Sequence, residues 1–263
     1  MKLLVQADDY GFTKGVTLGI IDGIKNGFLR NTGMFMNMPE AVHAATLIPS
    51  CPEACFGMDC NLVSGPSVSD PKTIPSLVDE NGDFIRSNIR MADPRWATEE
   101  GREAMFPIEE VRRELRAQYN RFVELVGRKP GYLHGHSIVT DSIRKVMDEL
   151  AGENSIILSG EARAKSFDVM TWGGGGLSPS KAFDPAAQVK KDPEGIFWNN
   201  RDEALKHDFV MTIGHCGFVD AALFDLTSLS IERARDHQMI TSKRIMQWIK
   251  ENDVQLITYY DLV

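Results

Sequence analysis

The chain has 263 residues, of which 43% are hydrophobic and 25% charged, an ordinary composition for a globular protein. Its formal net charge is −8 and no basic run is longer than a pair, so nucleic-acid binding through phosphate contacts is not expected. No apolar stretch approaches the roughly 20 residues of a membrane span, and the first residues are too few and too polar for a signal peptide. The four cysteines form no CxxC pair, which predicts free thiols and a cytoplasmic protein.

Apolar runs typical of strands alternate with helical patterns along most of the chain. The expected strands are 3–7, 32–37, 56–63, 132–136, 155–158, 209–213 and 255–259. The expected helices are 13–26, 40–48, 108–126, 141–150, 200–206 and 230–250. Segments 65–106 and 164–199 have no clear period and are expected to be loop excursions. The alternation predicts one α/β domain over residues 1–263, a TIM-like (β/α) barrel of parallel strands, complete or distorted.

Polar residues lie at or near the C-terminal ends of several expected strands, where barrel enzymes carry their active sites. They are Asp8, Asp9, Asp59, Asn61, His134, His136 and His215. The most informative stretch is the first strand, which runs directly into the adjacent carboxylates Asp8 and Asp9. Two like charges at a strand end are costly unless a cation lies beside them, so a divalent metal is expected there.

Asp59 lies in a segment otherwise suited to burial, and a buried charge needs a partner. Asp9, Asp59 and one or both of His134 and His136 offer mixed oxygen and nitrogen donors. Such a set suits Zn, Mn, Co, Ni or Fe, and suits Mg less well as nitrogen donors increase. The alternatives are a carboxylate satisfied by backbone amides for Asp59, and a structural histidine pair.

Three other features each allow a structural and a functional interpretation. Gly173–Gly176 is a flexible loop or a phosphate cradle, although no phosphate-binding motif surrounds it. Trp172, Phe197 and Trp198 are core residues or a platform for a sugar ring. Cys216 next to His215 is a buried thiol or, less favoured, a nucleophile.

At these residues the chain resembles the YdjC-like carbohydrate deacetylases, which include chitooligosaccharide deacetylases. Ala7-Asp8-Asp9-Tyr10-Gly11 is similar to the family's opening A-D-D-[FY]-G. The segments 57–62, 114–136 and 215–217 resemble G-L-H-x-N-L, a helix and strand ending in D-x-H-x-H, and H-P-G. Several short motifs in the same order, spread over nearly the whole chain, make the resemblance specific.

The resemblance implies a distorted barrel, a divalent metal and hydrolysis of an acetamido group on a sugar. Carried over by position, Asp8 is the general base, Asp9 and His136 are metal ligands, and His215 is a candidate acid or transition-state stabiliser. The chain departs from the pattern at Asp59, where the family has histidine, at His134, where it has aspartate, and at Ile138, where the last histidine of D-x-H-x-H would fall. Asp59 remains a candidate ligand, while His134 either adds a nitrogen donor or takes a role outside the ligand set.

The expected function is therefore a metal-dependent hydrolase that removes an acetyl group from an N-acetylated sugar or oligosaccharide. The metal is left open among Mg, Zn, Mn, Co and Ni. Two alternatives remain: a metal-dependent isomerase or lyase on a similar barrel, and a catalytically silent sugar-binding homologue. The expected partner is a small carbohydrate, with no nucleic acid and no membrane, and a homodimer is left open.

Overall fold

The computed structural model describes residues 1–168 and 184–262. Its strands are β1 (Lys2–Tyr10), β2 (Asn31–Met34), β3 (Cys55–Cys60), β4 (Tyr132–Gly135), β5 (Ile157–Leu158), β6 (Phe167–Asp168), β7 (Phe209–Gly214) and β8 (Gln255–Ile257). Its α-helices are α1 (Lys14–Asn26), α2 (Ala41–Leu47), α3 (Ser87–Ala92), α4 (Glu99–Met105), α5 (Ile108–Val126), α6 (Asp141–Asn154), α7 (Ser159–Lys165), α8 (Pro185–Val189), α9 (Pro193–Ala204), α10 (Ala221–Leu226), α11 (Ile231–Ile240) and α12 (Lys243–Glu251). Short 3₁₀ turns add η1 (Ile48–Ser50), η2 (Pro71–Thr73), η3 (Pro94–Ala97) and η4 (Tyr259–Leu262).

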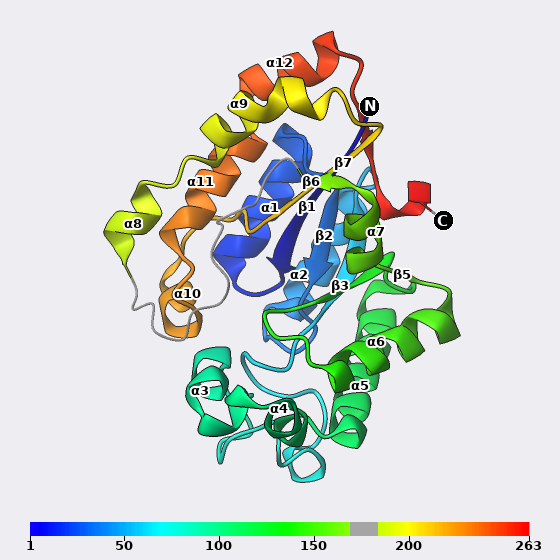
Figure 1. Ribbon diagram of the computed structural model, residues 1–263, viewed down its shortest axis with the longest axis vertical. Coiled ribbons are helices and arrows are strands. Elements are labelled where there is room, and N and C mark those ends of the chain that lie inside the picture. Colours follow the sequence, from blue (N-terminus) through cyan, green and yellow to red (C-terminus); the bar gives the residue numbers. More distant parts are fainter. Residues whose placement is uncertain (169–183, 263) are drawn as a thin grey trace.

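All strand pairs among the described residues are parallel, in the order β5-β4-β3-β2-β1-β7-β6, with β8 also pairing with β1. The sheet curls into a half-barrel whose edge strands β5 and β6 do not pair within the part of the chain that is described. Helices surround it, with α5 and α6 on one side and α1 and α11 on the other (Figure 1). The prediction of a distorted, TIM-like α/β fold is confirmed.

Alternate residues of β1 face two different layers. Leu3, Val5 and Ala7 belong to the large core under the helices. Leu4 belongs to a smaller cluster that also contains Tyr132 and Tyr259. Because side chains alternate along a strand, Gln6 and Asp8 follow Leu4 toward this inner cluster. Both are buried, so the strand that begins the chain carries a carboxylate into the half-barrel.

Local signals set the ends of the two best-predicted helices. Thr13 caps α1 by accepting a hydrogen bond from the Val16 N–H. Pro107 precedes α5, and Gly127 ends it in the left-handed conformation at φ 75°, which glycine adopts without steric cost. Both helices were expected at these positions.

The single helix expected over 230–250 is wrong, because two helices, α11 and α12, occupy this segment. The Phe28 N–H donates to the Ile240 carbonyl at 3.1 Å, so this carbonyl is bound by a distant segment where α11 ends. Ser242 then caps α12 by accepting from the Ile245 N–H. The periodic pattern continues through both helices and does not reveal this break.

The excursion over 65–106 is more regular than expected, since it contains α3 and α4. Buried Arg90 donates from its two terminal nitrogens to the carbonyls of Met105 and Ser76, at 3.1 and 2.7 Å, and so ties the excursion together. In Figure 1 it lies beyond the ends of the strands toward which β1 points. Of the other excursion, Gly173–Gly176 and Trp172 lie outside the described residues, while α8 and α9 form its later part.

Three further expectations concern Phe197, the cysteines and membrane spans. Phe197 is buried against Phe28 and Trp248, which confirms its structural reading. All four cysteines are free and buried, and burial raises the pKa of the Cys216 thiol, which disfavours a nucleophilic thiolate. Within the described ranges, none of the helices combines the length and the apolar character that a membrane span needs.

Candidate active site

The adjacent carboxylates Asp8 and Asp9 leave β1 in different directions. Asp8 follows the strand alternation into the half-barrel, whereas Asp9 has φ 76°, in the left-handed region. Aspartate tolerates this region better than most residues, at a cost of about 1–2 kcal/mol. The turn directs the Asp9 N–H to Asp59 Oδ2 at 2.9 Å. The backbone amide of Asp9 thus contacts the Asp59 carboxylate.

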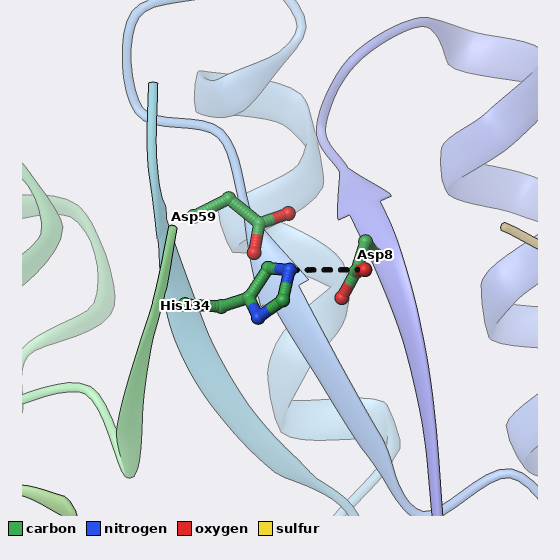
Figure 2. Close-up of side chains that lie close together, drawn as sticks. All are labelled: Asp8, Asp59 and His134. Atoms are coloured by element: carbon green, nitrogen blue, oxygen red, sulfur yellow. Dashed lines mark ion pairs between the residues drawn. The ribbon is translucent and has the colours of Figure 1, made fainter. Parts of the chain in front are cut away.

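Asp8 lies in one group with Asp59 and His134. One ligand atom of each residue lies within 4.8 Å of the others. Asp8 Oδ2 is 3.3 Å from His134 Nε2, and Figure 2 shows the three side chains converging from β1, β3 and β4. Asp59 and His134 are direct partners in the β3–β4 register, which places them side by side on neighbouring strands.

The three side chains of this group shift one another's pKa values. Burial raises the pKa of Asp8, but His134, His215 and the Gln6 hydrogen bond outweigh it and lower that pKa below its usual value. Burial and the nearby Asp8 charge raise the pKa of Asp59 well above its usual value. Burial lowers the pKa of His134, but Asp8 outweighs it and raises that pKa to about 9. A divalent ion would oppose both effects on Asp59 and allow its carboxyl to ionise beside Asp8.

The residues of this group suit such an ion. Two carboxylates and one imidazole form a mixed donor set of the kind that borderline divalent metals accept. Asp59 Oδ1 is buried and has no hydrogen-bond partner, although buried polar atoms are normally paired. Room for it comes from Gly33 on β2, where an added Cβ would lie 1.8 Å from Asp59 Oδ1. The unpaired Asp59 Oδ1 therefore fits the role of a metal ligand.

Asp9 forms a second group with Arg233 and His136. Arg233 Nη2 donates to Asp9 Oδ2 at 2.6 Å, and His136 Nδ1 lies 3.3 Å from Asp9 Oδ1. The Asp9 and Arg233 side chains are both 2% exposed. Burial raises the pKa of Asp9, but Arg233 and His136 outweigh it and hold that pKa well below its usual value. Asp9 is therefore an ionised carboxylate whose charge is already balanced by a guanidinium.

His215 follows β7 at the same rim. Its backbone N–H donates to Asp236 Oδ2 at 3.0 Å, which ties the loop after β7 to α11. Burial lowers the pKa of His215, although Asp9 and Asp8 act in the opposite direction. A partly buried histidine beside two carboxylates is a reasonable proton donor or acceptor at neutral pH.

Replacing Asp236 with asparagine is expected to stabilise the protein at pH 8. Burial raises the pKa of Asp236 to about 7, so its stabilising contribution is present below the unfolded pKa of about 3.9 and is lost as the pH rises through about 7. Asparagine keeps an oxygen for the His215 N–H and never ionises. The gain, of a few kcal/mol at most, should shrink toward pH 4. Thermal melts of both proteins across this range test it, and an equal difference in Tm at pH 4 and pH 8 would contradict it.

All six site residues expected from the sequence lie at this rim, but their grouping in the structure differs from the expected ligand set. Asp8, Asp59 and His134 converge, while Asp9 and His136 contact Arg233 or each other. The roles assigned from the sequence stay predictions. Sequence reasoning missed Arg233, Gln6, Tyr259 and Ser159, which hold the two groups. Gln6 carried a usable signal, because a glutamine within a buried strand needs partners, whereas Arg233 looks like an ordinary helix residue.

The chain belongs to the YdjC-like protein family, whose model matches residues 2–251. It is 30% identical to Carbohydrate deacetylase 2 of Listeria innocua serovar 6a, over 100% of this chain and 99% of that protein. It is 27% identical to the Chitooligosaccharide deacetylase of Proteus mirabilis, over 99% of this chain and 98% of that protein. The resemblance read from the motifs is confirmed.

Solved structures share the fold. A protein of Enterococcus faecalis V583, provisionally named for cellobiose-phosphate cleavage, matches with a TM-score of 0.75 at 22% identity, over 100% of this chain and 98% of that chain. A family 4 acetyl xylan esterase of Clostridium thermocellum, solved with a cobalt ion, matches with a TM-score of 0.51 at 10% identity, over 99% and 90%. At these identities the likeness concerns the fold alone.

Proposed function

We propose that the protein is a metal-dependent carbohydrate deacetylase, which hydrolyses the acetamido group of an N-acetylated sugar or oligosaccharide. The observation that carries the proposal is the convergence of Asp8, Asp59 and His134 at the strand ends of the half-barrel. Membership of the YdjC-like family and full-length relatives named carbohydrate and chitooligosaccharide deacetylases support the reaction class.

In this proposal Asp8, Asp59 and His134 hold the metal. Asp9 Oδ1, like Asp59 Oδ1, is buried without a hydrogen-bond partner, but Arg233 donates to Asp9 Oδ2 and its guanidinium would repel a second cation. A divalent ion at such a site polarises an amide carbonyl and makes a nearby water molecule more acidic. The alternative ligand set, expected from the sequence, is Asp9, Asp59 and His136, with or without His134, and with Asp8 as the base.

The second group and His215 supply proton transfer. The carboxylate of Asp9, fixed by Arg233, contacts His136 Nδ1 and so orients that ring. The His136 side chain is 19% exposed, which lets its other nitrogen reach a solvent molecule. His136 then accepts a proton from the attacking water, and His215 gives one to the departing amine. Each transfer needs a hydrogen-bond distance in the bound complex rather than in the free protein.

Two of the three departures from the family motif, at positions 59 and 134, are compatible with a metal site. Relative to the motif, an imidazole and a carboxylate have changed places between positions 59 and 134. These positions face each other in the β3–β4 register. The exchange therefore leaves one imidazole and one carboxylate in the same small volume, beside Asp8, and supports retention of a metal site with a shifted centre.

Acetate release tests the proposed function. Metal-stripped protein is incubated with N,N′-diacetylchitobiose or N-acetylglucosamine, with no metal or with Zn²⁺, Mn²⁺, Co²⁺, Ni²⁺ or Mg²⁺. Acetate that appears only with a metal is the expected result, because the buried carboxylates need a cation to act. A protein that binds metal and consumes either sugar without releasing acetate is an isomerase or a lyase instead. Stabilisation by the sugar with no product from it would indicate a silent binding protein.

A further inference from the structure

A chain of three hydrogen bonds and one ion pair passes through Asp8 and His134. The Tyr259 hydroxyl donates to Gln6 Oε1, and Gln6 Nε2 donates to Asp8 Oδ1 at 2.6 Å. Asp8 Oδ2 faces His134 Nε2 at 3.3 Å, and His134 Nδ1 lies 2.7 Å from Ser159 Oγ. The three outer members are at most 4% exposed, so the chain excludes water from both ends.

The chemistry of its members fixes the orientation of the chain. An ionised carboxylate only accepts hydrogen bonds, so the Gln6 amide nitrogen must face Asp8 and its oxygen must face Tyr259. The Tyr259 hydroxyl must then be the donor. At the other end, a proton on His134 Nδ1 has Ser159 Oγ as its acceptor. In the metal-free protein the proton on His134 Nε2 faces Asp8 Oδ2, and its loss would leave the Nε2 lone pair directed toward Asp8 and Asp59.

Each end of the chain is anchored in a different part of the fold. The Tyr259 N–H donates to Asn31 Oδ1 at 3.0 Å, and the Asn31 side-chain amide donates to carbonyls of Val5 and Ile257. The Tyr259 ring stacks on Tyr132, with ring centroids 3.9 Å apart. Ser159 is the first residue of α7, directly after β5. Neither anchor depends on a surface loop.

We propose that Tyr259, Gln6 and Ser159 are positioning residues, which hold the Asp8 carboxylate and the His134 ring in the orientation that binds the metal. The inference rests on the proposed function, since it assigns these residues to its metal site. Loss of an outer partner of a metal ligand typically costs about 10- to 100-fold in metal affinity. A purely structural role would lower Tm and leave the affinity of the folded protein unchanged.

The experiment measures Co²⁺ binding to the metal-stripped full chain by titration calorimetry and by visible absorption, which reports the ligand geometry. The variants Tyr259→Phe and Ser159→Ala each remove one oxygen, and Ser159→Thr restores the hydroxyl. Matched controls are Tyr119→Phe and Ser142→Ala, because these hydroxyls are also hydrogen-bonded, to Asn154 and Phe106, outside the chain. All proteins are compared well below their Tm.

We expect Tyr259→Phe and Ser159→Ala to bind Co²⁺ about 10- to 100-fold more weakly, with an altered spectrum, and Ser159→Thr and both controls to resemble the parent protein. Parent-like affinity and spectrum in Tyr259→Phe and Ser159→Ala would overturn the inference while leaving the metal site in place. A parent protein that binds neither Co²⁺ nor any other of the five metals would overturn the metal site itself. If Ser159→Ala does not fold, Tyr259→Phe decides alone.

Discussion

Replacing Asp8 with asparagine is expected to weaken divalent-metal binding by more than about 100-fold, whereas Asp9→Asn is expected to keep it within about tenfold of the parent protein. Asp8 lies with Asp59 and His134 in the group whose ligand atoms converge. Asp9 is instead bound to Arg233 and His136. The carboxylates are adjacent and equally buried, so each is the natural control for the other.

Titration calorimetry with Zn²⁺ on the metal-stripped variants makes this comparison. His134→Ala and His136→Ala form a second matched pair, from alternate positions at the end of β4, and His134→Ala should show the larger loss. The reverse order, with Asp9 and His136 the critical residues, would contradict the grouping seen in the structure and support the ligand set expected from the sequence. Acetate release in the same variants then separates residues that bind the metal from residues that transfer protons.

Arg233→Met is expected to destabilise the protein by about 3–5 kcal/mol, because it leaves the Asp9 carboxylate buried without its partner. For a chain of this size, such a loss lowers Tm by roughly 6–20 °C. The Asp9 and Arg233 side chains are each 2% exposed and lie 2.6 Å apart, so solvent does little to screen the lost charge. The double variant Asp9→Asn/Arg233→Met should recover part of the loss, since it removes the unpaired charge as well.

Arg95→Met is the control, because Arg95 also pairs with an aspartate but its side chain is 60% exposed. An exposed pair of this kind contributes about 0–1 kcal/mol. Calorimetric melts of the single and double variants measure both effects. The prediction is wrong if Arg233→Met melts at the same temperature as Arg95→Met, or if the double variant is no more stable than Arg233→Met.

Much of the fold was predictable from local signals. The boundaries of α5 follow from Pro107, from Gly127 and from an apolar stripe between them. The interruption between α11 and α12 was not predictable, because it involves the Phe28 N–H, which reaches the Ile240 carbonyl from a distant part of the chain. The short helices α3 and α4 were missed for a similar reason, since Arg90 stabilises them through carbonyls of neighbouring turns.

In the candidate site, too, features set by local sequence were predictable and features set by long-range contacts were not. Its location was predictable, since polar residues at the ends of parallel strands meet at one rim. The separation of these residues into two groups was not. It depends on the left-handed conformation of Asp9 and on Arg233, which lies 224 positions away in the sequence. No pattern near Asp9 indicates that a guanidinium from α11 neutralises it.

The left-handed turn at Asp9 also bears on how this motif would be transplanted. An Asp-Asp dipeptide grafted onto the strand end of another barrel would place its carboxylates on opposite faces of the sheet, as ordinary strand alternation requires. To reproduce the pair found here, a designer would have to build the reversal of φ at the second aspartate as well. The hydrogen bond from its N–H to a carboxylate on the next strand but one, at 2.9 Å, would be part of the graft. The transferable motif therefore consists of the left-handed backbone at Asp9 together with the Asp59 carboxylate that accepts from its N–H. The Asp-Asp sequence alone does not specify it.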